Sequence, residues 1–294
     1  MNKLNFIAEK ILAKLHRLKR RVVSNYSKQK TIRELKTEVV QCIICEDSHH
    51  LNVISKEDRY GLPITTVECA RCGLVFTNPM PTQKFLDYFY SSGLYRGLYK
   101  GFLKANSKFV EIDKSKERAL ERISFAERIA MDKIEANISI NVLDFGCSEG
   151  TFPKEFKLKH PTIMAYGLEP GNSFSSINKE NIDGMFDQAE DIPPQIRFNL
   201  ITMWHVLEHL RNPLNVLKQL VSTLDKNGKI IIEVPDYTIH SSRNRPFHIG
   251  HVYHFTDTTL TKLLYKAGLK IAHIGRTGTG ELRAVAETSA DQHD

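Results

Sequence analysis

Four of the five cysteines in this 294-residue chain fall into two pairs with the same internal spacing. Cys42 and Cys45 form the first pair, Cys69 and Cys72 form the second, and 23 residues separate the pairs. A two-residue gap lets both thiolates of a pair point at one ion, and four thiolates complete a tetrahedron around Zn²⁺. Such a site has no open coordination position for a reaction. We therefore expect a structural zinc ion in a zinc-ribbon module.

Three histidines stand at positions that suit a base for proton transfer. His205 and His209 follow one apolar segment of the chain, and His251 follows the next. Histidine is the side chain whose ordinary pKa lies closest to neutral pH, so it accepts a proton readily from a hydroxyl or amine. For each of the three, a hydrogen-bonded structural histidine is the alternative interpretation.

The elements that would position these groups begin near residue 140, where short apolar segments alternate with helical ones, as in a mainly parallel sheet. The expected strand Ile140–Phe145 contains Asp144 and runs into a turn with Gly146, Cys147 and Gly150. Glycines there let a ligand approach the backbone, and the following helix offers free N–H groups. We interpret Cys147 as a small residue that packs beside this ligand, because no paired base accompanies it.

A second expected strand, Met164–Leu168, ends at Glu169. A carboxylate at this place can accept hydrogen bonds from both hydroxyls of a ribose, as the acidic residue of dinucleotide-binding folds does. The turn after the first strand lacks the G-x-G-x-x-G spacing of those folds, which disfavours NAD. The sequence thus predicts a nucleoside cofactor of another kind.

At this point the chain resembles the class I S-adenosylmethionine-dependent methyltransferases over about residues 138–290. The motifs that carry the resemblance are Asp144–Gly150, Gly167–Pro170 and Asn199–His209. The resemblance implies an α/β fold with a Rossmann-like seven-stranded sheet, five parallel strands being followed by an antiparallel hairpin. It also implies S-adenosylmethionine as cofactor. The implied cofactor-binding residues are Asp144, Gly146, Cys147, Gly150, Glu169, Gln188, Ala189, Met203 and His205, with Gln188 and Ala189 at the edge of the adenine.

The segment His248–Thr256 is similar to the E-H-x-x-Y-F-S segment of zinc-containing sugar C-methyltransferases, in which the histidine is the base. By this resemblance His251 is the expected base and His209 the second choice. Gly250 replaces the preceding glutamate and His254 replaces the tyrosine, so we expect methylation at oxygen or nitrogen.

Together these features predict methyl transfer to a sugar or nucleotide-sugar in the biosynthesis of a surface polysaccharide or secondary metabolite. An RNA methyltransferase is one alternative, and a quinone or lipid O-methyltransferase is another. A binding module that has lost catalysis is the alternative from a different class. The glycine turn and Glu169 argue against it.

Charge is concentrated at the N-terminus. Residues 1–40 carry 11 Lys and Arg against three Glu, so the net charge of +7 leaves the other 254 residues at −1. This distribution disfavours a nucleic-acid partner, because a phosphate-binding face needs basic residues on the catalytic domain. Apolar residues recur at helical spacing in the basic arm, which docks on protein or contacts an anionic membrane through residues 1–30. We expect a cytoplasmic protein, with peripheral membrane contact as a secondary hypothesis.

Four segments follow from these patterns. We expect a basic amphipathic helical arm over 1–38, a zinc-ribbon module over 39–81, a helical linker or lid over 82–135 and the methyltransferase domain over 136–294. An aromatic-rich interruption is expected within the linker at Phe89–Tyr99, as part of the core or as the roof of a substrate pocket.

Overall fold

The computed structural model describes residues 25–102, 110–135, 139–170, 182–242 and 246–288. The apolar stripe of the predicted arm lies in residues 1–24 and therefore outside the described residues; a helix over 25–34 is its described end. Among the described helices, none combines the length and the apolar character needed to cross a bilayer.

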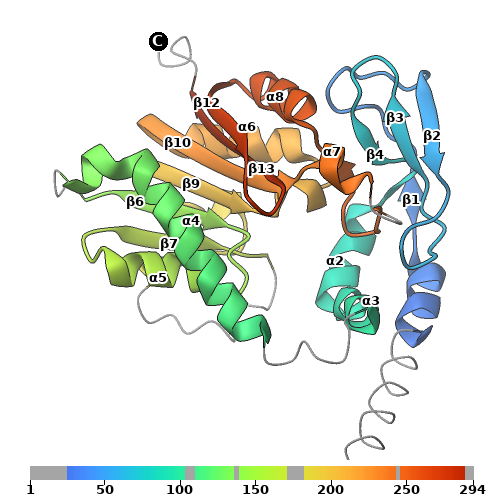
Figure 1. Cartoon of the computed structure of the whole chain (residues 1–294), viewed down its shortest axis with the longest axis horizontal. Helices are drawn as coiled ribbons and strands as arrows, with labels where there is room; N and C mark the ends of the chain where they lie inside the picture. Colours follow the sequence, from blue (N-terminus) through green and yellow to red (C-terminus); the bar gives the residue numbers. More distant parts are fainter. Residues whose placement is uncertain (1–24, 103–109, 136–138, 171–181, 243–245, 289–294) are drawn as a thin grey trace, which may run out of the picture.

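A seven-stranded mixed sheet forms the larger part of the molecule (Figure 1) and confirms the predicted fold class. Its spatial order is β12-β13-β10-β9-β6-β7-β8, in which β13 runs antiparallel to the other six strands. The strands are β6 (Asn141–Phe145), β7 (Met164–Leu168), β8 (Gly184–Phe186), β9 (Phe198–Trp204), β10 (Leu224–Pro235), β12 (Leu269–Arg276) and β13 (Glu281–Thr288). The order reverses between β6 and β9, and a ligand cleft is expected outside the carboxyl ends of these strands.

Helices cover both faces of this sheet. Along β10, Ile230 and Ile232 pack in one apolar cluster and Ile231 in another, because successive side chains of a strand point to opposite faces. The first cluster includes α6 (Pro213–Thr223) and α8 (Asp257–Lys266), and the second includes α4 (Val110–Glu135) and α5 (Thr151–Lys159). The sheet is thus buried on both sides, as a mainly parallel sheet requires.

A smaller four-stranded sheet carries the cysteine pairs, and its order is β11-β4-β3-β2. The strands are β2 (Leu51–Ser55), β3 (Thr66–Cys69), β4 (Val75–Thr77) and β11 (Tyr253–His254), while β1 (Thr37–Glu38) pairs with β5 (Met80–Pro81) alongside. Strand β11 comes from the far end of the chain, with Tyr253 opposite Phe76 and His254 opposite Val75. The histidine-rich segment is therefore built into the cysteine-bearing sheet.

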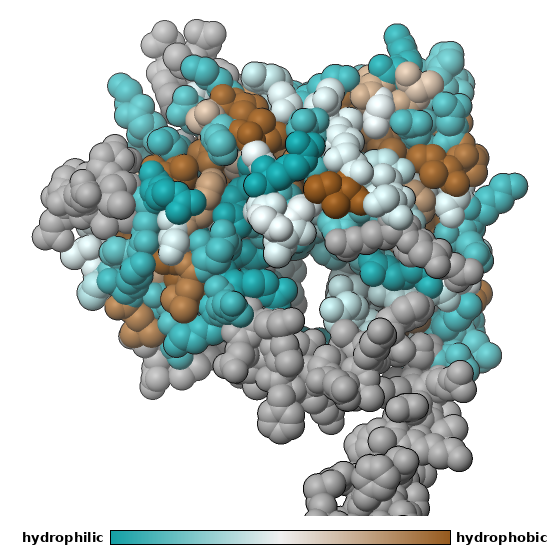
Figure 2. Space-filling view, in the orientation of Figure 1, coloured by the Kyte–Doolittle hydropathy of each residue, from teal (hydrophilic) through white to brown (hydrophobic). Residues whose placement is uncertain are grey.

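Two helices, α2 (Gln83–Ser91) and α3 (Leu94–Phe102), follow the smaller sheet. The expected interruption at Phe89–Tyr99 is wrong in extent, because helix is lost only at Ser92 and Gly93, where Gly93 has a φ of 76°. Phe89 is fully buried, whereas Tyr90 and Tyr99 are 37% and 41% exposed. Some of the aromatic residues thus belong to the core, as one interpretation expected, and the role of the others as the roof of a substrate pocket stays a prediction. In the space-filling view the molecule is hollowed between these helices and the larger sheet (Figure 2).

Candidate functional site

The turn after β6 has the backbone that its glycines predict. Gly146 and Gly150 have φ values of 76° and 72°, and Gly150 is the N-cap of α5. A Cβ at position 146 would lie 2.4 Å from Cγ2 of Val206, so no larger residue fits there. This close approach also joins the glycine turn directly to the segment that carries His205 and His209.

Two carboxylates lie beside the turn. Glu169 accepts a hydrogen bond from the backbone N–H of Ser148 (2.9 Å), and burial raises the pKa of Glu169. Asp144 is buried and accepts a hydrogen bond from the hydroxyl of Thr202 (2.7 Å). Burial raises the pKa of Asp144 to about 7, although the bond from Thr202 opposes this shift. Glu169 is therefore hydrogen-bonded to the turn, whereas Asp144 lies buried at the end of β6 that leads into it.

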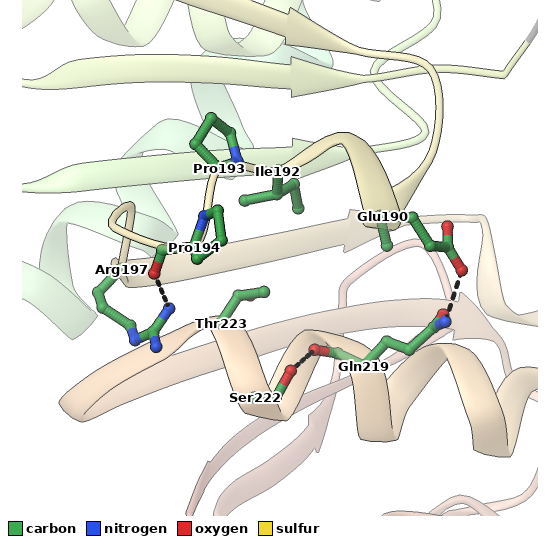
Figure 3. Close-up of a pocket in the computed structure, with 9 residues that line it drawn as sticks. Glu190, Ile192, Pro193, Pro194, Arg197, Gln219, Ser222 and Thr223 are labelled. Carbon is green, nitrogen blue, oxygen red and sulfur yellow. Dashed lines mark hydrogen bonds between the residues drawn. The ribbon is translucent and has the colours of Figure 1, made fainter.

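The loop after β8 contains Gln188 and the short helix η2 (Ala189–Asp191). Glu190 accepts a hydrogen bond from the side chain of Gln219 on α6 (2.6 Å), which ties this loop to the helix (Figure 3). A hollow of about 400 Å³ lies against the loop and α6, lined by Pro193, Arg197 and neighbouring residues. Ala189, predicted at the edge of the adenine, also lines it, but none of the candidate histidines or cysteines does. We therefore do not regard it as the reaction site.

Four histidines gather where the segment after β9 meets the segment before β11. The ring centroids of His209 and His251 are 4.6 Å apart, and those of His248 and His251 are 3.8 Å apart. His254 is the fourth, 6.4 Å from His251. Nδ1 of His209 lies 2.7 Å from the carbonyl oxygen of Gly250. We refer to these four residues as the histidine cluster.

Burial controls the charge of the cluster. It lowers the pKa of His251 and His248 well below the usual value, and neighbouring imidazoles add to the effect. The pKa of His209 is lowered as well, and that of His254 falls to about 3. The four rings are therefore neutral near pH 7, and a neutral imidazole whose acceptor nitrogen is not already hydrogen-bonded can accept a proton or bind a cation.

Helix α2 reaches the cluster through Tyr90. Its hydroxyl lies 2.9 Å from Nδ1 of His209 and donates to the carbonyl of Gly250 (3.2 Å). A Cβ at position 250 would lie 3.1 Å from this hydroxyl and 3.1 Å from Cε1 of His248. Glycine at 250 therefore leaves the space that Tyr90 occupies, which accounts for the departure from the resembling segment at this position.

His205 differs from the cluster because two acidic groups face it. Its Nδ1 lies 3.3 Å from Glu208, and its Nε2 lies 3.4 Å from Glu233. Burial alone would lower its pKa, but the two carboxylates outweigh this effect and raise the pKa of His205 to about 9. Glu233 also pairs with Arg122 (2.6 Å) and Arg283. His205 therefore belongs to a charged network beside the neutral cluster.

This shift predicts a pH dependence of folding. Because the pKa of His205 is higher in the folded chain than in the unfolded chain, its contribution to stability is full below about pH 6.5 and is lost as pH rises through about 9. We expect the difference in free energy of unfolding between the parent and His205→Gln to shrink over this range, measured by urea denaturation. A difference that is constant or grows from pH 6 to pH 9.5 would contradict the assignment. His273→Gln, on exposed β12, is the control.

The four cysteine thiols converge in the smaller sheet. The Sγ atoms of Cys42 and Cys72 are 3.4 Å apart, as are those of Cys45 and Cys69, and all four lie within 4.8 Å of one another. Each pair ends in the same backbone turn, with positive φ at Glu46 (62°) and Gly73 (79°). Four thiolates around an ion at about 2.3 Å would be separated by similar distances, so the arrangement fits a tetrahedral metal site.

The remaining predicted cofactor residues lie at different depths. Met203 is fully buried, and its side chain belongs to the apolar core beneath the sheet's carboxyl edge. Cys147 is also buried, close to Gly167, and burial raises the pKa of its thiol. Gln188 lies exposed in the loop after β8, its side-chain amide near Asp191.

Sequence reasoning missed three participants. Tyr90 lies in a segment with many aromatic residues, and His248 lies in a segment with several histidines. Glu208 is adjacent to His209, and nothing in the sequence pattern singles it out. The repeated histidines of His248–His254 were the available signal for the cluster. No local signal pointed to Tyr90, because its contact with His209 spans 119 residues of sequence.

Comparison with known proteins identifies the family of the chain. Residues 109–274, more than half of the chain, match the family described as a methyltransferase domain. The chain belongs to this methyltransferase family. The matched range contains the glycine turn, Glu169 and the histidine cluster, but it leaves out the cysteine-bearing sheet except for β11.

Two curated relatives match parts of the methyltransferase. The mitochondrial ubiquinone biosynthesis O-methyltransferase of Candida albicans is 26% identical over 121 residues, 38% of this chain and 37% of that protein. The tRNA U34 carboxymethyltransferase of Campylobacter fetus is 34% identical over 101 residues, 31% of this chain and 35% of that protein. The chain thus spans little more than a third of the length of each of these curated relatives.

Solved structures share the fold. The plantazolicin methyltransferase BpumL, in complex with a desmethylated plantazolicin analogue and SAH, has a TM-score of 0.55 at 14% identity and covers 69% of this chain and 94% of its own. The SAH-bound magnesium protoporphyrin IX methyltransferase of Synechocystis PCC 6803 has a TM-score of 0.50 at 17% identity, with 69% and 97% covered. At these identities the likeness concerns the fold alone.

Proposed function

We propose that the protein transfers a methyl group from S-adenosylmethionine to oxygen or nitrogen of a polar small molecule, a sugar or nucleotide-sugar. The observation that carries this proposal is the contact between Gly146 and Val206, which sets the glycine turn against the segment of His209, whose ring centroid lies 4.6 Å from that of His251. A nucleoside bound at the turn would have its reactive end next to a cluster of neutral imidazoles.

The residues around the turn suit this nucleoside. S-adenosylmethionine supplies an electrophilic methyl group on a sulfonium. Glu169 would accept hydrogen bonds from the ribose, and the open backbone at Gly146 and Gly150 would face the amino-acid end. Gln188 and Ala189 stand at the expected edge of the adenine, in the loop that Glu190 anchors to α6.

The histidine cluster would handle the acceptor. A hydroxyl or amine must be held in line with the methyl group and must lose a proton, steps that alignment and a neutral base accelerate. His251 is our first choice for this base and His209 our second, because both rings are neutral and retain 18% and 22% side-chain exposure.

The surroundings of the cluster favour a polar ring as acceptor. Tyr90, Tyr95 and Tyr99 form a chain of aromatic contacts with centroids 5.3 and 6.2 Å apart, and Tyr90 reaches His209. Aromatic faces with hydroxyl groups offer both apolar contact and hydrogen bonds, which suits a hydroxylated ring. The net charge outside residues 1–40 is close to zero, which gives no support to RNA as the acceptor.

We also propose that the four cysteines bind Zn²⁺ in a structural role. The four thiol groups and the matching turns at Glu46 and Gly73 support this choice. The ion would join the turn at Cys42 and Cys45 to the turn between β3 and β4, and β11 pairs with β4. The buried Cys42 and Cys69 belong to the same apolar cluster as Phe76 and Tyr253, so the ion would stabilise the sheet that includes β11.

The test is transfer of labelled methyl from S-adenosylmethionine to three pools: nucleotide-sugars, total RNA and quinols. We expect label in the nucleotide-sugar pool and a loss of at least about 100-fold in His251→Ala, within the usual effect of a general base. Label confined to RNA or quinols would refute the sugar proposal, and label in none of the pools would refute methyl transfer to all three acceptor classes. The quinol pool is included because one curated relative is an O-methyltransferase of ubiquinone biosynthesis.

A further inference from the structure

Glu208 is a buried acid without a hydrogen-bond donor. Its side chain is 1% exposed, and within the described part of the chain neither carboxylate oxygen accepts a hydrogen bond. A buried carboxylate in this state is costly, because it has lost its hydration without replacement. His205 is a cationic neighbour at 3.3 Å, but it does not complete a hydrogen bond to either carboxylate oxygen, so Glu208 has room for a further cationic partner.

Imidazole nitrogens surround one oxygen of this acid. Oε1 of Glu208 lies 3.9 Å from Nε2 of His209 and 4.0 Å from Nε2 of His251, while Nδ1 of His205 lies 3.3 Å away. One ligand atom each from Glu208, His209 and His251 can be chosen so that all lie within 4.8 Å of one another. Ligand atoms about 2.0–2.2 Å from a tetrahedral ion are about 3.3–3.6 Å apart, so the two imidazole nitrogens would have to come about half an ångström closer to Oε1 of Glu208.

The ring hydrogen of His209 lies on Nδ1, which leaves Nε2 free to bind a metal ion. Nδ1 lies 2.7 Å from the carbonyl oxygen of Gly250, which can only accept, so Nδ1 carries the hydrogen. Nε2 then presents a lone pair toward Glu208. A histidine that donates one ring N–H to a backbone carbonyl and turns its other nitrogen to an ion is the usual outer arrangement of a metal site.

His248, the histidine nearest to His251, uses its acceptor nitrogen in a hydrogen bond to the backbone. Nδ1 of His248 accepts the backbone N–H of Gly250 (3.1 Å), so this nitrogen is not free for an ion. His205 divides its charge between Glu208 and Glu233, of which Glu233 also pairs with Arg122 and Arg283. The free donor set is therefore one carboxylate and two imidazoles.

We propose that Glu208, His209 and His251 bind one divalent transition-metal ion. Two imidazoles and a carboxylate suit Zn²⁺, Fe²⁺ or Co²⁺, whereas Mg²⁺ prefers oxygen ligands. Three protein ligands leave coordination positions open, unlike the closed four-cysteine site. The two histidines remain partly exposed, so an acceptor can reach the ion.

This inference rests on the proposed methyl transfer, and it replaces the role of base that we gave to His251 and His209 with the role of metal ligand. An acceptor hydroxyl bound to the ion loses its proton to solvent more easily, because the ion stabilises the oxyanion. The oxygen then forms a bond to the methyl carbon as the bond from that carbon to the sulfonium breaks, leaving S-adenosylhomocysteine. His209 and His251 act in this case as ligands of the ion.

The experiment titrates Co²⁺ into the full chain after the four-cysteine site has been saturated with Zn²⁺, and follows binding by calorimetry and visible absorption. We expect one equivalent of Co²⁺ with the spectrum of nitrogen and oxygen ligands. Glu208→Gln and His209→Gln should each weaken binding at least about 100-fold, while the control His273→Gln binds as the parent does.

Two results would overturn the metal site: no additional equivalent of Co²⁺ in the parent, or equal affinity in the parent and both ligand variants. Retained zinc and an unchanged circular dichroism spectrum show that the variants are folded. The measurement contains no methyl acceptor, so it can fail while the proposed methyl transfer succeeds, and the reverse.

Discussion

Removal of the ion from the four-cysteine site is expected to abolish methyl transfer, although none of the four cysteines belongs to the histidine cluster. Strand β11 pairs with β4, so Tyr253 and His254 belong to the same sheet that the proposed zinc ion would stabilise. The backbone N–H of Val252 donates to the carbonyl of Glu208 (2.9 Å), which extends this connection to the segment of His209. Loss of the ion should therefore displace the cluster.

The expected effect is large. Structural zinc contributes about 10–16 kcal/mol to the folding of isolated zinc-finger peptides; a part of that contribution would shift the melting temperature by many degrees here. We expect Cys69→Ser to lose zinc, to melt at a lower temperature and to retain less than about 1% of the methyl transfer rate. Zinc content by atomic absorption, thermal denaturation and the labelled-methyl assay are measured together.

Cys147→Ser is the control for zinc content, because Cys147 lies apart from the four-cysteine site and should leave the ion in place. The prediction fails if Cys69→Ser keeps a full equivalent of zinc. It fails equally if that variant loses the ion but transfers methyl groups at the parental rate.

Replacement of Glu169 by alanine is expected to weaken binding of S-adenosylmethionine about 100- to 1,000-fold. A carboxylate that accepts two hydroxyl groups makes two charge-assisted hydrogen bonds, each worth about 1.5–3 kcal/mol. The variant also leaves the backbone N–H of Ser148 without its carboxylate acceptor. Calorimetric titration of parent and variant with the cofactor measures the loss.

Glu117→Ala serves as the matched control, because Glu117 lies exposed on α4. It should bind the cofactor as the parent does. Equal affinities in Glu169→Ala and the parent would show that the nucleoside binds elsewhere and that the assignment of the ribose ligand is wrong.

The sequence predicted the large sheet well because each central strand is a short apolar run between turn residues. Ile230, Ile231 and Ile232 illustrate why such a run is recognisable, since both faces of β10 are buried under helices. The glycine turn was equally accessible, because Gly146 has a φ that only glycine adopts readily and a neighbour that excludes a side chain.

The parts that escaped prediction depend on contacts between distant segments. Strand β11 consists of two residues, too few to carry a periodic pattern, and it exists because Phe76 and Val75 offer an open edge. The distinctive property of Glu208 is the absence of a donor, which only a folded chain reveals. Tyr90 reaches His209 because Gly250 leaves room, and that relation joins three separate segments.

The most direct test of the account is a crystal structure of the protein in complex with S-adenosylhomocysteine. We predict that the ribose hydroxyls lie on Glu169, that the amino-acid end faces Gly146 and that the sulfur points toward His251. A nucleoside bound instead in the hollow between the loop after β8 and α6 (Figure 3), or with its sulfur directed away from the histidine cluster, would contradict the proposed site.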